Sequence, residues 1–179
     1  FPYTTLFRSG EFKQDLHSKG LHLWDGTTRV SVHHCLLARD NDRNPDIAAF
    51  GVIDVVNNVF ANASGWTELK NKGKAKGPAG GFGQPTVNLV KNYYQHGPAS
   101  DDTSVGNYGY EVRYYDYQKA RNPCEIYLEG NLGNWHRSTT SQPESDIVRP
   151  SDRWMIKPER YPAPAITEYP APAAYESVL

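Results

Sequence analysis

Short apolar strands recur along the chain, and each is interrupted at the same place by a small polar residue. The four copies are VHHCLL (32–37), VVNNVF (55–60), LVKNYY (89–94) and LEGNLG (128–133). Each copy opens with an apolar residue, and its fourth position holds Cys35, Asn58, Asn92 or Asn131. No convincing 3.6-residue period occurs before Ala173. The pattern therefore predicts an all-β protein built from short strands.

A polar amide at one fixed place in a repeated strand predicts stacked coils. Parallel strands lie about 4.8 Å apart, and stacked Asn side chains can hydrogen-bond to one another along the stack. The first two copies are close enough for a bare coil, and the later ones leave room for excursions at 65–85 and 96–124. The repeat by itself leaves a parallel β-solenoid and a β-sandwich open.

The two ends of the chain differ from its middle. The first nine residues, FPYTTLFRS, match the translation of a common sequencing adapter, so we leave 1–9 out of the fold and expect the natural N-terminus upstream. Residues 10–150 are expected to form the coils. After Pro150 the motif YPAPA occurs at 161 and again at 169, which favours an extended chain. We expect 151–179 to run along the surface, anchored by Trp154 and Met155.

Composition excludes several functional classes. Lys and Arg number 19 against 20 Asp and Glu, so no overall charge steers the chain to nucleic acid. The sequence contains no run of 18 apolar residues, so it predicts no membrane-spanning helix. Two cysteines, Cys35 and Cys124, are too few for a disulfide scaffold, and we expect them to stay unpaired. We find no Ser–His–Asp set, no glycine-rich phosphate loop and no paired carboxylates for glycoside hydrolysis.

Four motifs then follow one another in order: HSKG (17–20), VSVHH (30–34), RNP (43–45) and DVVNNVF (54–60). In this order and spacing they closely resemble pectate lyases of polysaccharide lyase family one, especially bacterial ones. The resemblance covers roughly Asp15 to the end of the chain. It implies a right-handed parallel β-helix, secretion, and calcium-dependent β-elimination of polygalacturonate. It also implies that this chain is the C-terminal part of such an enzyme, truncated at its N-terminus.

The resemblance assigns roles to individual residues. The family's catalytic arginine lies in an Arg-x-Pro motif after the His-His strand, which corresponds to Arg43. A family lysine that contacts the substrate carboxylate corresponds to Lys19, and we expect His34 and Pro45 at the substrate groove. The family's calcium carboxylates lie upstream of HSKG, so no metal ligand is assigned here. Many members carry further arginines after Arg-x-Pro, whereas this chain has Asp46 and apolar residues.

Arg43 can take either of two roles. The β-elimination of a uronate removes a proton next to a carboxylate, so cations must neutralise that carboxylate. Arginine keeps its proton under ordinary conditions, and its residue type indicates a bidentate carboxylate clamp. The family role as a base requires neighbouring cations that favour the neutral guanidine. The sequence leaves both roles open.

Other polar residues receive structural interpretations. His33 and His34 are adjacent on a strand and point to opposite faces, so they do not share an ion, and one is expected inside the coil. Asn57 is expected in a turn or at the surface beside the ladder residue Asn58. Alternation should send the tyrosines of the second excursion to two faces. A solvated loop is favoured over an anion-binding one for four alternating lysines, Lys70, Lys72, Lys74 and Lys76.

The leading hypothesis is thus a piece of a secreted, monomeric pectate lyase that is inactive without its upstream calcium site. Two alternatives remain. One is a non-catalytic β-helix that binds acidic polysaccharide, motivated by the missing arginines. The other is a lyase on another pectic polymer, including methylated pectin, against which the cationic residues argue.

Overall fold

The computed structural model describes residues 20–24, 27–40, 42–63, 66–71, 84–101, 109–115 and 124–178. Within these ranges the strands form three sheets, and all of their pairings are parallel. Sheet 1 contains β1 (His22–Leu23), β4 (Asp46–Ile47), β7 (Thr67–Lys70) and β10 (Val112–Tyr115). Sheet 2 contains β2 (Thr28–His33), β5 (Phe50–Val56), β8 (Pro85–Val90), β11 (Glu125–Glu129) and β13 (Ile156–Lys157). Sheet 3 contains β3 (Leu36–Ala38), β6 (Val59–Ala61), β9 (Tyr93–Gln95) and β12 (Leu132–Gly133).

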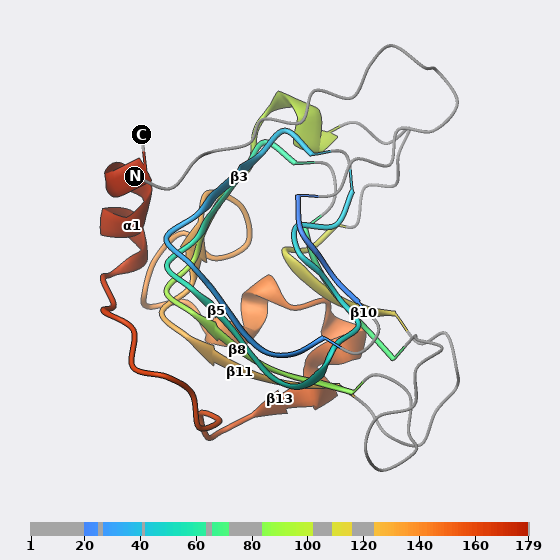
Figure 1. The fold of residues 1–179 in the computed structure, drawn as a ribbon. Coiled ribbons are helices and arrows are strands. Elements are labelled where there is room, and N and C mark those ends of the chain that lie inside the picture. Colours follow the sequence, from blue (N-terminus) through green and yellow to red (C-terminus); the bar gives the residue numbers. More distant parts are fainter. Residues whose placement is uncertain are drawn as a thin grey trace.

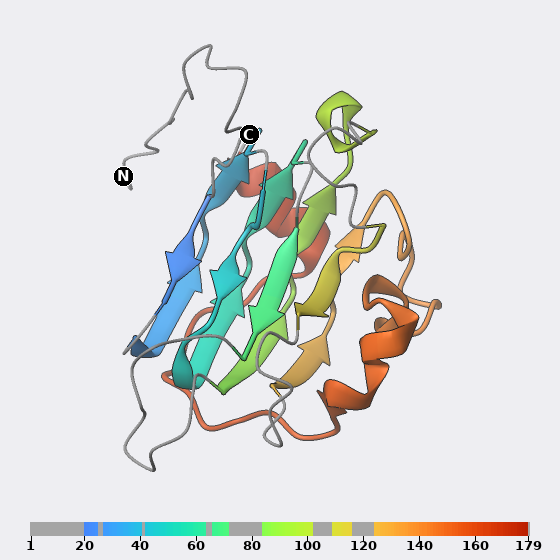
Figure 2. The same ribbon diagram turned by 90° about the vertical axis from the view of Figure 1, so that its right-hand side faces the viewer.

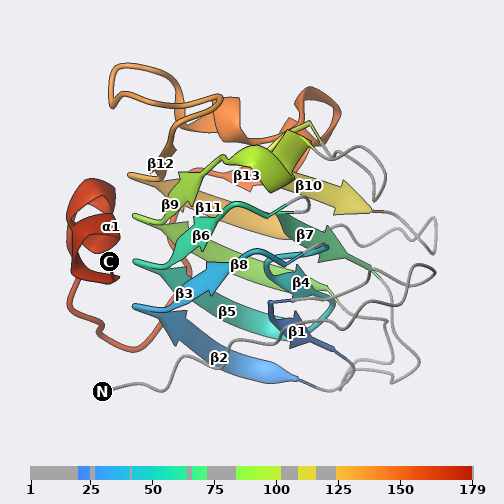
Figure 3. The ribbon, with the colours of Figure 1, turned by 90° about the horizontal axis from the view of Figure 1, so that it is seen from above.

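From β1 to β12 successive strands visit sheets 1, 2 and 3 in turn, and each of these strands from β4 on lies beside the strand three before it (Figures 1 and 3). β13 then adds to sheet 2 beside β11. Sheet 1 faces the viewer in Figure 2. Helical segments are short: η1 (Pro98–Asp101), η3 (Glu144–Ile147), η4 (Pro150–Met155) and α1 (Ala171–Val178). The predicted architecture of parallel strands with few helices is confirmed, and it is compatible with stacked coils. It argues against the β-sandwich, whose sheets are antiparallel.

The asparagine ladder predicted from the repeat is present. Strand registers pair Val32 with Val55, Val55 with Leu89 and Leu89 with Leu128, which are the first residues of the four copies. Asn58 Nδ2 donates to Asn92 Oδ1 at 3.1 Å, and Asn92 Nδ2 donates to Asn131 Oδ1 at 3.0 Å. The ladder stops at Cys35, whose backbone N–H donates to Asn58 Oδ1 at 3.1 Å. The amides thus tie together the turns that join sheet 2 to sheet 3.

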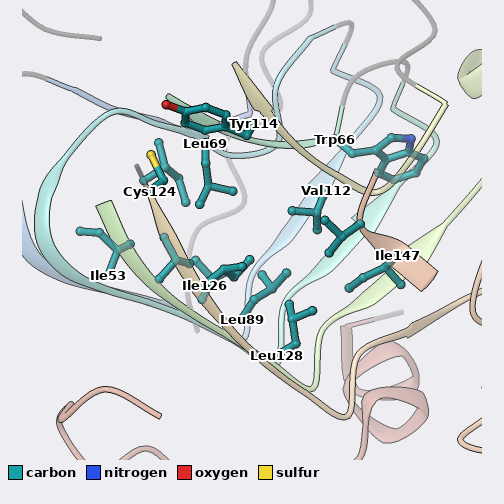
Figure 4. Close-up of a cluster of buried hydrophobic side chains, with 14 of the residues drawn as sticks. Ile53, Trp66, Leu69, Leu89, Val112, Tyr114, Cys124, Ile126, Leu128 and Ile147 are labelled. Atoms are coloured by element: carbon teal, nitrogen blue, oxygen red, sulfur yellow. The ribbon is translucent and has the colours of Figure 1, made fainter. Parts of the chain in front are cut away.

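The space enclosed by the sheets is filled by apolar side chains (Figure 4). Sheet 2 contributes Ile53, Leu89 and Ile126, and sheet 1 contributes Leu69 and Val112. Each of these five side chains is fully buried, which removes its apolar surface from water. The core therefore fixes which side chains of each strand point outward.

Cys35 and Cys124 are not joined by a disulfide. Cys124 is buried in the core, whereas Cys35 is half-buried at the start of its turn. Burial raises the pKa of the Cys35 thiol, which keeps it protonated near neutral pH.

The expectation that one histidine of the His-His pair packs inside the coil is wrong. Val30 and Val32 pack against the core, so alternation leaves His33 exposed. His34 has φ 54°, a left-handed turn conformation that ends the strand's alternation. Its ring therefore lies on the same side as that of His33, with the two Nδ1 atoms 3.0 Å apart.

The C-terminal segment crosses the outer face of sheet 2 before α1 packs beside β6 and β9 (Figures 1 and 3). Asn88 Oδ1 accepts the N–H of Tyr161 at 3.0 Å, and Asn88 Nδ2 donates to the Tyr161 carbonyl at 3.0 Å. Asn57 binds Tyr169 in the same way, at 2.8 and 2.6 Å. Both tyrosines open a YPAPA repeat, so one asparagine clamp holds each copy. Asn57 lies in a turn, as expected, yet this segment buries it completely.

The two anchors proposed for this segment behave differently. Met155 is fully buried in the core, whereas half of the Trp154 surface is exposed, and its indole meets the Tyr114 ring edge-on. Met155 is therefore the stronger anchor of the pair.

Replacing Asn57 or Asn88 with alanine should loosen the C-terminal segment. Each change removes two hydrogen bonds to a tyrosine backbone, so we expect a loss of about 1–2 kcal/mol in unfolding free energy and faster proteolysis between 158 and 170. Ser177→Ala, which removes one hydrogen bond inside α1, should change neither. Cleavage that is equally slow in the clamp variants would contradict this role.

Candidate functional site

A row of charged side chains crosses the outer face of sheet 1. The register places His22 beside Asp46, Asp46 beside Glu68, and Glu68 beside Arg113. The next residues along these strands, Leu23, Ile47, Leu69 and Tyr114, belong to the core. Because side chains alternate between faces, the charged row must lie on the opposite face from the core. Lys70 is two residues beyond Glu68 on this same outer face.

Lys70 lies at the centre of the row. Its Nζ lies 2.8 Å from Asp46 Oδ1 and 2.6 Å from Glu68 Oε1, and it lies 5.8 Å from the centre of the Trp24 ring. Lys70 is only 1% exposed. A solvated loop is therefore the wrong interpretation for Lys70, because strand β7 carries it into a buried ion pair. The other three alternating lysines, at 72, 74 and 76, lie outside the described residues.

Arg43 joins this row from the turn before β4. Its Nε lies 3.0 Å from Asp42 Oδ2 and 3.1 Å from Glu68 Oε1, and its Nη1 lies 3.9 Å from Asp46 Oδ2. One fifth of the Arg43 side chain is exposed, whereas all three carboxylates are buried. Carboxylates at these distances stabilise the guanidinium cation. Of the two roles left open by the sequence, this geometry favours a charged clamp over a base.

The residues around Arg43 fix its place. Pro45 is buried, and its carbonyl accepts the N–H of Glu68 at 2.9 Å, so it positions the turn and does not face solvent. A Cβ on Gly20 would lie 1.9 Å from Asn44 Oδ1, so this position requires glycine. Lys19, next to Gly20 in the sequence, lies outside the described residues.

His34 lies at a different place, after β2 of sheet 2. Its ring meets the Tyr169 ring edge-on at 5.7 Å, so it contacts the C-terminal segment. Burial, together with the charge of His33, lowers the pKa of His34. The structure therefore brings Arg43 and Pro45 together but places His34 under the C-terminal segment.

Sequence reasoning missed most of the acidic partners. Asp46 was read only as a departure from the family arginines, and Glu68 and Arg113 were not singled out. The signal was present in TELK (67–70), where two charged residues alternate with Thr67 and Leu69. Charged residues at alternate positions of a strand share one face, so Glu68 and Lys70 were recognisable as neighbours.

Calcium, which the family resemblance implies, does not fit the described residues. Asp46 and Glu68 already bind Lys70, and Asp42 binds Arg43. In the described ranges no group of three or more His, Cys, Asp or Glu side chains is arranged to hold a metal ion. We therefore derive no step through calcium.

Comparisons with known proteins give no neighbour. No family model, no curated protein and no solved structure matches the chain. Among the helices that the structure describes, none has the length and apolar character to cross a membrane.

Proposed function

We propose that the chain is a right-handed parallel β-helix from a secreted, monomeric pectate lyase that cleaves polygalacturonate by β-elimination. The four ordered motifs support this proposal, and the parallel strands and asparagine ladder are compatible with it. The observation that carries it is the placement of Arg43 of the RNP motif, partly exposed, on the charged outer face of sheet 1.

In this proposal Arg43 clamps a substrate carboxylate. A guanidinium presents its N–H donors in a planar fork that matches a carboxylate. Asp42 and Glu68 hold the guanidinium from the protein side, which limits the entropy lost when substrate binds. Three carboxylates (Asp42, Asp46 and Glu68) balance three cations (Arg43, Lys70 and Arg113) in this group. Net attraction for an anionic polymer must therefore come from further cations, and Lys19 is the one that the motif names.

Arg43→Lys tests the proposed activity. We expect it to lower the release of unsaturated uronide from polygalacturonate by roughly a hundredfold, because lysine lacks the planar fork. Product is followed by its ultraviolet absorbance, in the presence of calcium. Arg39→Lys, at an exposed position in the preceding turn, is the matched control. An unchanged rate in Arg43→Lys would remove Arg43 from catalysis.

A second candidate function is the binding of acidic polysaccharide without cleavage. The contacts of Arg43 favour it, since a guanidinium held by two carboxylates can clamp an anion but cannot accept a proton. Calcium-independent retention on polygalacturonate, with no unsaturated product, would identify this function. Faster product release from methylated pectin would instead indicate a lyase on another pectic polymer.

A further inference from the structure

Two adjacent imidazoles meet nitrogen to nitrogen at the end of β2. His33 Nδ1 lies 3.0 Å from His34 Nδ1, and the two ring planes are nearly perpendicular, at 86°. In a regular strand, neighbouring residues point to opposite faces and do not share an ion. The left-handed turn at His34, with φ 54°, breaks this alternation and brings both rings to one side of the strand. The distance between the two nitrogens then decides whether the pair can hold an ion.

This distance matches two nitrogens that bind one transition-metal ion. Metal–imidazole bonds are about 2.0–2.1 Å long, so two bound nitrogens lie about 2.9 Å apart at a right angle and about 3.3 Å apart at the tetrahedral angle. The observed 3.0 Å is closer to the right angle. Right angles belong to the square-planar and tetragonal sites that Cu(II) and Ni(II) prefer. Calcium, by contrast, takes oxygen ligands.

The surrounding chain holds the pair in this geometry. His34 N–H donates to the Val56 carbonyl at 3.2 Å, and the N–H of the next residue, Cys35, donates to Asn58 Oδ1 at 3.1 Å. The Tyr169 ring meets the His34 ring edge-on at 5.7 Å. The turn is therefore fixed by β5, by the end of the asparagine ladder and by the C-terminal segment. Ligands that are fixed in advance lose less entropy when an ion binds.

The pair has no acidic partner in the part of the chain that the structure describes. His136 is different, because its Nδ1 lies 2.7 Å from the buried carboxylate of Glu111. A carboxylate takes up one imidazole nitrogen as a hydrogen-bond donor. His33 and His34 instead turn both Nδ1 atoms toward each other, and one Nδ1–H donates to the lone pair of the other ring. His33 is exposed and His34 is partly exposed, so ions in solution reach them.

We propose that His33 and His34 form a two-histidine site for a divalent transition-metal ion, with Cu(II) bound most tightly. Each Nδ1 gives its lone pair to the ion, and water fills the remaining positions, so no third side chain is needed. Small rotations about χ2, a broad torsion in histidine, turn both lone pairs toward one ion. The ring that now donates its Nδ1–H carries that proton on Nε2 instead. This site lies apart from Arg43 and is independent of the proposed lyase activity.

Titration of this chain with Cu(II) tests the site. At one equivalent, the electron paramagnetic resonance spectrum should show a tetragonal ion coupled to two imidazole nitrogens. His33→Gln should weaken this binding by at least about tenfold, because a single imidazole loses the advantage of the linked pair. His34→Asn should do the same and keep the turn, since asparagine tolerates a left-handed φ and already adopts one at Asn57. Competition should give weaker binding of Ni(II) and Zn(II) than of Cu(II).

Two control variants separate the pair from other ligands. His136→Gln removes a partly exposed imidazole that is not part of the pair, and it should leave the Cu(II) affinity unchanged. Cys35→Ser should also leave it unchanged, because the Cys35 thiol donates to the His33 carbonyl at 3.3 Å and is not a proposed ligand. Unweakened binding in His33→Gln, or a loss in Cys35→Ser equal to that in His33→Gln, would overturn the proposal.

Nitrogen-15 NMR reads the tautomers directly. Without metal, one Nδ1 of the pair should be protonated. At saturating Zn(II), which is diamagnetic, both rings should carry their proton on Nε2, while the His136 signals stay unchanged. An Nδ1–H of the pair that persists at saturating Zn(II) would show that the two rings only hydrogen-bond to each other, and the proposed site would then be wrong.

Discussion

Replacing Lys70 with methionine is expected to destabilise the protein by about 3 kcal/mol, one of the two largest effects that the structure predicts. Lys70 is buried between Asp46 and Glu68 at 2.8 and 2.6 Å. Removing one partner from a buried ion pair leaves a charge that neither water nor protein compensates, which costs roughly 3–5 kcal/mol. Arg43 and Arg113 still contact the carboxylates, so the lower end of this range applies. Urea unfolding measures the change.

The matched control is Lys157→Met. Lys157 pairs with Glu125 at 3.0 Å, but both side chains are about two-fifths exposed. Exposed pairs contribute about 0–1 kcal/mol, so this variant should unfold near the wild-type midpoint. Adding Asp46→Asn to Lys70→Met should recover part of the loss, since it removes one uncompensated charge. Equal destabilisation by the two lysine variants would show that the charged row is not a buried network.

The same row shows what the sequence could and could not predict. The repeat predicted the ladder because Asn58, Asn92 and Asn131 occupy equivalent positions in copies that differ elsewhere. It did not predict the partners of Lys70, since Asp46 and Glu68 come from different strands. Their contact depends on the register of β4 against β7. The sequence repeat covers the strands of sheet 2 and the turns after them. It therefore carries no information about how β4 and β7 of sheet 1 align.

The histidines illustrate a second limit. Alternation holds as far as Val32, which packs against the core, and His33, which is exposed. It fails at His34, because the strand ends there in a positive-φ turn, so the expectation of one histidine inside was wrong. The pair of His136 and Glu111 was invisible for another reason. The two residues are 25 positions apart and lie in irregular segments, where no period relates one side chain to another.

Asn92→Ala is the second change with a large expected effect. Asn92 is fully buried, and its amide makes four hydrogen bonds. Its Oδ1 accepts from Asn58 N–H and Nδ2, and its Nδ2 donates to the Val55 carbonyl and Asn131 Oδ1. Alanine leaves the Asn58 N–H and the Val55 carbonyl buried without these partners, each at about 1–3 kcal/mol, and also leaves a cavity. We expect a loss of at least about 3 kcal/mol.

The loss of stability should depend on where the asparagine lies in the fold, and replacing an exposed asparagine should cost little. Asn134→Ala removes an exposed amide that binds only the backbone of His96, so we expect a loss below about 1 kcal/mol, because water replaces these bonds. Hydrogen exchange should accelerate at the Asn58 amide in Asn92→Ala and stay slow in Asn134→Ala. Because the ladder joins neighbouring turns between sheets 2 and 3, the acceleration should extend to the flanking strands β5 and β8. If exchange changes only at the Asn58 amide, each turn is stabilised separately, and the ladder adds no cooperativity between the strands that it joins.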